Sequence, residues 1–164
     1  MSWWQRIIEW LRKLFGGGGA AAATVGCIDF STMATGSSYP NPWSLTGPNG
    51  GTATFETINP AGSGAPGPAA NNRVHTVSGN TGVDCNFTLE IAFPAASQLS
   101  FKLLHTSQPA RIDALDSAGA VVGTGVQGSA QHVLSTVTIS ASGMVKAVVH
   151  SPADENILTE FCAT

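Results

Sequence analysis

Residues 83–93 read Val83-Asp84-Cys85-Asn86-Phe87-Thr88-Leu89-Glu90-Ile91-Ala92-Phe93, and every second side chain is apolar or a cysteine. Successive side chains of a β-strand point to opposite faces of a sheet, so this period of two predicts a strand with one buried face and one solvated face. Proline has no backbone N–H to donate to a neighbouring strand, so we expect Pro94 to end it.

The same alternation recurs on both sides of this segment. We predict a hairpin turn at 116–119, and Pro- and Gly-rich loops at 36–50 and 59–72. Eight to ten short strands at this spacing predict an all-β domain, an antiparallel β-sandwich. The further strands are expected at 99–103, 133–139, 145–149 and 157–162, with weaker ones at 25–30, 52–58, 73–77, 110–115 and 119–124.

Charged residues are few, and they are distributed unevenly along the 164 residues. Residues 1–23 carry three basic groups and one acidic group, whereas the remainder carries four basic and nine acidic groups, a net charge of −5. An acidic body cannot neutralise a phosphate backbone, so we expect no nucleic-acid partner. We divide the chain into a helix at 1–15, a Gly/Ala linker at 16–23 and a β-sandwich domain at 24–164.

Residues 1–15 have a different period. Drawn at about 100° per residue, their large apolar side chains fill one arc of a helix and the polar side chains fill the other. Ser2 and Gln5 have the spacing of a capping box, and the glycines at 16–19 are expected to end this amphipathic helix. The residues expected to mediate attachment are Trp3, Trp4, Ile7, Ile8, Trp10, Leu11, Leu14 and Phe15.

Three partners for this helix stay open. It can pack against copies of itself and form a homo-oligomer. It can lie on a membrane surface with Arg6, Arg12 and Lys13 facing the headgroups, because about 20 Å of helix is too short to cross about 30 Å of hydrocarbon. It can also fold back onto its own domain, although a docked helix needs no glycine linker. We favour self-assembly.

Four segments carry a family resemblance. They are Cys27-Ile28-Asp29-Phe30, the stretch 111–124, Val137-Thr138-Ile139 and the stretch 144–149. These segments look like the strands and turns of bacterial extracellular jelly-roll domains, which are similar to the galactose-binding-like carbohydrate-binding modules. The resemblance spans about 25–162, excludes the helix and includes no catalytic motif, so it bears on the fold more than on a ligand. The last strand, 156–162, departs from the family pattern.

The resemblance implies a jelly-roll β-sandwich outside the cell or on a cell or particle surface, although we recognise no signal peptide in 1–15. It also implies that the first and last strands are neighbours, which would allow a disulfide between Cys27 and Cys162. Three buried free thiols are the alternative. Cys85 continues the apolar face of its strand and is expected in the core.

The same pairing would bring Asp29 and Glu160 together. Domains of this family often hold a structural calcium ion near their terminal strands, and Asp154 and Glu155 could add oxygen ligands. Two solvated carboxylates are the alternative. No other cofactor is expected.

One Pro-rich loop contains two aromatic residues, Tyr39 and Trp43. Exposed rings on rigid loops stack on sugar rings, which makes this pair a candidate ligand site. The alternative places Trp43 as a plug at the open end of the sandwich. The four histidines have no metal-binding spacing and are expected to be structural.

Catalysis finds no support in these patterns. The sequence has no G-x-S-x-G motif, and Glu56 and Glu90 are candidates only as isolated acids on predicted strands. We therefore predict a non-catalytic structural or surface-display subunit that self-assembles through its N-terminal helix, with the sandwich facing outward. The alternative is a carbohydrate-binding module that binds a glycan and is tethered to a membrane by the helix.

Overall fold

The structure is a computed structural model that describes residues 22–58, 73–85, 87–151 and 156–164. The helix predicted at 1–15, most of the linker at 16–23, and Asp154 and Glu155 lie outside the described residues. Within these ranges the chain forms ten strands, and every pairing is antiparallel, which confirms the all-β class. The described segments contain no helix long and apolar enough to cross a membrane.

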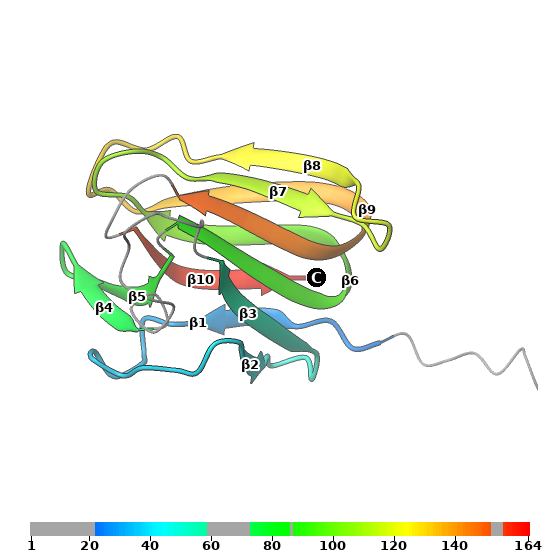
Figure 1. Cartoon of the computed structure of the whole chain (residues 1–164), viewed down its shortest axis with the longest axis horizontal. Coiled ribbons are helices and arrows are strands. Elements are labelled where there is room, and N and C mark those ends of the chain that lie inside the picture. The colour runs from blue at the N-terminus through cyan, green and yellow to red at the C-terminus, as the bar shows by residue number, and fades with distance from the viewer. Residues whose placement is uncertain (1–21, 59–72, 86, 152–155) are drawn as a thin grey trace, which may run out of the picture.

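The strands join into one hydrogen-bonded sheet that folds over on itself (Figure 1). Their bounds are β1 Gly26–Asp29, β2 Trp43–Thr46, β3 Thr52–Ile58, β4 Val74–Val77, β5 Asn80–Asp84, β6 Phe87–Leu104, β7 Arg111–Leu115, β8 Val121–Val126, β9 Ser135–Ser151 and β10 Ile157–Ala163.

Two long strands, β6 and β9, run through both layers of the sandwich. The first half of β6 pairs with β3 and with the second half of β9, where Leu89 lies opposite Val149. The second half of β6 pairs with β10 and with the first half of β9, where Phe101 lies opposite Val137. One layer therefore contains β2, β3, β7 and β8, and the other contains β1, β4, β5 and β10.

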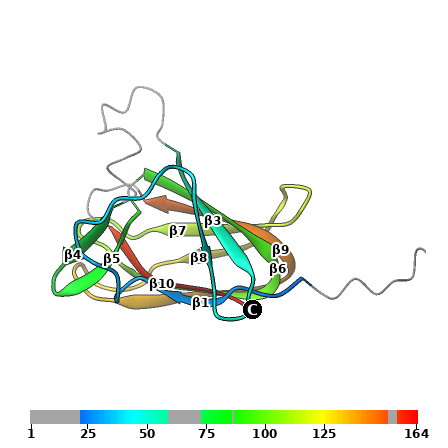
Figure 2. The ribbon, with the colours of Figure 1, turned by 90° about the horizontal axis from the view of Figure 1, so that it is seen from below.

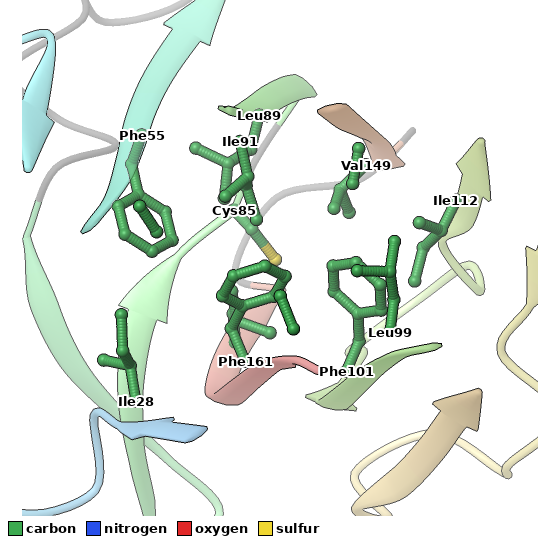
Figure 3. Packing of buried hydrophobic residues seen from close by; sticks show 14 of the residues in the cluster. Ile28, Phe55, Cys85, Leu89, Ile91, Leu99, Phe101, Ile112, Val149 and Phe161 are labelled. Atoms are coloured by element: carbon green, nitrogen blue, oxygen red, sulfur yellow. The ribbon is translucent and has the colours of Figure 1, made fainter. Parts of the chain in front are cut away.

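The core lies between these layers. Leu89, Ile91 and Ile112 point inward from one side and meet Phe101 and Phe161 from the other (Figure 3). All five side chains are at most 1% exposed. The alternating apolar residues of the predicted strands are thus the residues that fill the core.

Pro94 does not end its strand, contrary to the prediction. β6 continues to Leu104, and Pro94 lies where its register against β9 is irregular, between Ala92 and Ala96. Proline is tolerated at such a bulge because the missing N–H would have no partner there. The strands predicted separately at 83–93 and 99–103 are therefore largely one strand, and those at 133–139 and 145–149 are also one.

Two strands were not predicted, and one residue was misplaced. β2 lies inside the segment expected to be a loop at 36–50, and β5 follows the strand predicted at 73–77 and takes Val83 and Asp84 from the strand predicted at 83–93. Both are short, at four and five residues, so an alternating pattern is hard to recognise. Val133 precedes β9 and is 49% exposed, so it does not belong to the buried face.

The first and last strands lie side by side. Cys27 and Cys162 face each other in the register of β1 and β10 and form a disulfide, in agreement with the bond that the resemblance implied. Figure 2 shows β1 running along β10, with the C-terminus beside the start of β1. Cys85 is a free, buried thiol in the core, as predicted.

Replacing Cys27 and Cys162 together by alanine should lower the free energy of unfolding by about 4–5 kcal/mol, because the bond closes a long loop. The two cysteines are 135 residues apart in the sequence. Urea unfolding of both proteins measures the difference. The stability of the double variant should also be insensitive to reductant. Equal stability of this variant and of the oxidised unmodified protein would contradict the expectation.

Candidate functional site

A polar hollow of about 320 Å³ opens on the outer face of the layer that contains β1 and β10. It lies where β1 ends beside the turn between β4 and β5. Its floor comes from β10 and β6, and one apolar side chain, Leu134, completes the wall. The lining residues are Asp29, Ser31, Gly79, Asn80, Thr81, Lys102, Leu134, Thr159 and Glu160.

Three charged residues cross this hollow in one row. Glu160 on β10 lies opposite Asp29 on β1 and, on its other side, opposite Lys102 on β6. Two carboxylates directly opposite each other repel, and the Lys102 ammonium group in the same row offsets part of that repulsion. No salt bridge among the described residues includes any of the three, although Asp29 Oδ1 accepts a hydrogen bond from Ser31 N–H.

Asp29 is held in its ionised form. The hydroxyl and the backbone N–H of Ser31 lower the pKa of the Asp29 carboxyl, and the charge of Lys102 lowers it further. The backbone contact is a hydrogen bond of 2.8 Å from Ser31 N–H to Asp29 Oδ1. At neutral pH the hollow therefore presents a fixed carboxylate at its edge.

Local irregularities shape the hollow. The register of β10 shifts between Leu158 and Glu160, so that Thr159 is displaced. Its hydroxyl donates to Lys102 O at 3.0 Å, and its own carbonyl accepts from Phe30 N–H at 2.9 Å. These bonds fix β1 and β6 on either side of β10 and so fix the spacing of the charged row.

The opposite rim is the turn between β4 and β5. Ser78 precedes the lining residue Gly79, and its Oγ lies 3.0 Å from Nδ1 of His132. Both Ser78 and His132 have positive φ, at 50° and 61°, a backbone conformation that costs free energy in residues other than glycine. The hydrogen bond between them ties the turn to the loop that carries Leu134.

The calcium ion implied by the resemblance would need six to eight oxygen ligands. The structure does bring Asp29 and Glu160 together, as that prediction requires. Lys102 adds a positive charge to the same hollow, and the described residues include no group of three or more His, Cys, Asp or Glu that could hold a metal. The described side chains alone do not make a full calcium shell.

Tyr39 and Trp43 lie together, but not in the hollow. Trp43 is only 5% exposed, so it occupies the core position of the alternative interpretation and is not an exposed platform. It stacks between Tyr39 and Phe55, with ring centroids 4.6 Å apart on each side. Tyr39 is the outermost ring of this column and is partly buried.

On the outer face of the other layer, a network surrounds Asp113. Its Oδ1 accepts from Arg111 Nη2 at 2.9 Å and from the Thr124 hydroxyl at 2.8 Å, and its Oδ2 lies 3.2 Å from His150 Nε2. Burial raises the pKa of Asp113, but these hydrogen bonds and the charges of Arg111 and His150 outweigh it, so the pKa is below its usual range.

Glu56 and Glu90 lie opposite each other on β3 and β6. Glu90 Oε2 forms a salt bridge of 2.7 Å with Lys146 Nζ, and neither glutamate lines the hollow. Each of the four histidines has a hydrogen-bond partner, as their predicted structural role requires. The partners are Asp84 for His75, the Ser129 carbonyl for His105, Ser78 for His132 and Asp113 for His150.

Most of the residues that line the hollow were not predicted from the sequence. Asp29 and Glu160 were singled out, whereas Lys102, Asn80 and Thr81 were not. Lys102 had a recognisable signal, because it is the charged residue on the solvated face of the strand predicted at 99–103. Asn80 and Thr81 had none, since they belong to the short strand β5 and its turn.

No family model matches the chain, and no curated protein matches it. A solved structure that does match is the carbohydrate-binding module CsCBM6-3 from Clostridium stercorarium, in complex with cellobiose. It is 14% identical, with a TM-score of 0.39, and the match covers 89% of this chain and 98% of that chain. At this distance neither its ligand nor its binding residues are carried over.

Asp113→Asn should make the protein less dependent on pH in the acid range. An aspartate whose pKa is lower in the folded state stabilises the protein fully at pH values above its unfolded-state pKa, which is about 4. That stabilisation is lost as the pH falls through the lower pKa of the folded state. We expect the variant to lose about 1–3 kcal/mol at pH 7, with a smaller further loss between pH 4 and pH 2. Urea unfolding across this range tests it, with the exposed Glu56→Gln as the control. Parallel pH profiles of the variant and the unmodified protein would refute the role of Asp113.

Proposed function

We propose that the domain is a non-catalytic binding module of jelly-roll type, and that its ligand is a glycan bound in the polar hollow. The observation that carries this proposal is the row formed by Asp29, Glu160 and Lys102, which opens to solvent without internal salt bridges. The disulfide between Cys27 and Cys162 fits a domain that works outside the cell, where such bonds persist.

The lining of the hollow favours a polyhydroxylated ligand. Carboxylates accept hydrogen bonds, ammonium groups donate them, and the Asn80 amide does both. An apolar ligand would leave these groups without partners after displacing their water, at a cost of about 1–3 kcal/mol per group. Sugar hydroxyl groups donate and accept at once, so they can replace the water molecules one for one.

Glu160→Gln should weaken glycan binding by about tenfold or more, because a hydrogen bond to a charged group contributes about 1.5–3 kcal/mol. The substitution keeps the shape of the side chain. An array of neutral, acidic and amino oligosaccharides would first identify a binding glycan, and calorimetric titration would then compare the affinities.

Glu56→Gln is the matched control, since it makes the same change on the outer face of the other layer. The control should bind as the unmodified protein does. Binding that survives Glu160→Gln but is lost in Tyr39→Ala would move the site to the aromatic column. Finding no binder on the array would contradict the proposal. Melting curves with calcium and with a chelator would show separately whether the hollow binds the ion.

We propose that the N-terminal segment attaches the protein to other copies of itself through Trp3, Trp4 and Trp10, and we favour this over attachment to a membrane surface. Burial of large apolar side chains contributes about 1.5–3 kcal/mol each, before the entropic cost of association. Trp10→Asp should convert a defined assembly into smaller species in light scattering without detergent. If the mass does not change and the unmodified protein instead binds anionic vesicles, the membrane alternative holds.

A further inference from the structure

The longest stretch of the body without a charged side chain lies between Asp116 and Lys146. It contains no Asp, Glu, Lys or Arg, although the rest of the body is acidic. This stretch covers β8 and the first half of β9. Natural sheets usually block their edges with charged residues, lysine above all, because an open edge invites another strand.

β8 is such an edge. It forms the upper rim of the molecule in Figure 1 and, among the described residues, pairs only with β7. The Gln127 N–H donates to Ala110 O at 3.0 Å. Because the bonds of an antiparallel ladder alternate, the N–H and C=O groups of Thr124 and Val126 then point away from β7.

The side chains along this edge are apolar and exposed. Val121, Val122 and Val126 are 56%, 37% and 60% exposed. The inner face has no room for side chains, since a Cβ at Gly123 or Gly125 would overlap Ile139 or Val137 of β9. β8 therefore packs closely against β9, and no described strand other than β7 pairs with it.

Most of the β8 sequence reads the same in both directions. Residues 122–126 read Val122-Gly123-Thr124-Gly125-Val126, a palindrome about Thr124. In an antiparallel pair related by a two-fold axis at Thr124, each threonine faces its copy and Val126 faces Val122 of the other chain. Val122 is the unpaired residue of the bulge against β7, so the backbone pairing between copies centres on the two Thr124 residues, and the valines add side-chain contacts.

We propose that β8 is a pairing edge for a second copy of this chain, joined antiparallel about Thr124 so that the sheet continues across two molecules. Any strand that pairs antiparallel with its own copy about a two-fold axis uses the same patch twice, and here the palindrome places valine opposite valine and glycine opposite glycine. Two acidic domains repel each other over most of their surfaces, and β8 offers a surface without that repulsion. This inference does not depend on the helix or on the polar hollow.

A cysteine on the proposed axis tests the pairing in the full chain. Thr124→Cys should form a disulfide between copies under mild oxidation, about tenfold faster or more than Thr46→Cys at micromolar concentration, since paired copies hold the two thiols at about millimolar effective concentration. Thr46 is a matched control. It is an exposed threonine on the edge strand β2, and it also has a hydrogen bond to the neighbouring strand.

A second substitution separates this edge from other contacts. Val126→Lys in the Thr124→Cys background should slow cross-linking by about tenfold, because lysines at a sheet edge block pairing. A two-fold interface contains the substituted residue twice, which doubles the effect on its free energy. Ile58→Lys, an exposed apolar residue on β3, should have no effect. Equal melting temperatures would show that both variants fold.

The outcomes are distinct. Equal cross-linking at positions 124 and 46 overturns the proposal and is the result expected if copies associate only through residues 1–15. Insensitivity to Val126→Lys also overturns it. Should Thr124→Cys fail to fold, light scattering of Val126→Lys against Ile58→Lys decides the matter, because only the first should reduce the mass.

Discussion

The pairing of β6 with β9 is the constraint on which the rest of the domain depends. Among the described strands only these two enter both layers, and each of the others pairs with one of them or is joined to them through a neighbouring strand. Both bend at the same level. β6 is irregular around Pro94, and β9 has Gly143 there with a φ of 71°, which a residue with a side chain rarely adopts. The bend turns one sheet into two facing layers and encloses the core.

The charged groups of the two outer faces differ in how they are paired. On the layer with β7, Arg111 and Lys146 are each held by a carboxylate at less than 3 Å. In the hollow, Lys102 shares a row with two carboxylates and forms no salt bridge among the described residues. Paired charges leave a ligand little to bind, whereas the open row keeps its hydrogen-bonding capacity.

The sequence predicted the class of fold and most strands because burial on one face imposes a period of two. It predicted the neighbouring positions of Asp29 and Glu160 only through a resemblance that made the terminal strands adjacent. It could not predict that Pro94 lies within a strand, because the bulge that accommodates it depends on pairing with β9. It could not choose between the two interpretations of Trp43, since an apolar aromatic residue in a Pro-rich loop has the same local pattern whether the ring faces solvent or Phe55.

The hollow and the β8 edge share no residue, and this separation matters for how a weak site can work. A polar, solvent-exposed pocket gains little net free energy per hydrogen bond, because water competes for the same groups. Two copies joined along β8 would carry two hollows on one continuous sheet, and a repeating ligand that reaches both is held about 10²–10⁴ times more tightly than by one. The gain requires no new contact in the hollow. An edge without charges and a hollow of modest affinity would therefore be compatible in one small domain, since pairing along the edge would raise the affinity of two linked hollows for a repeating ligand.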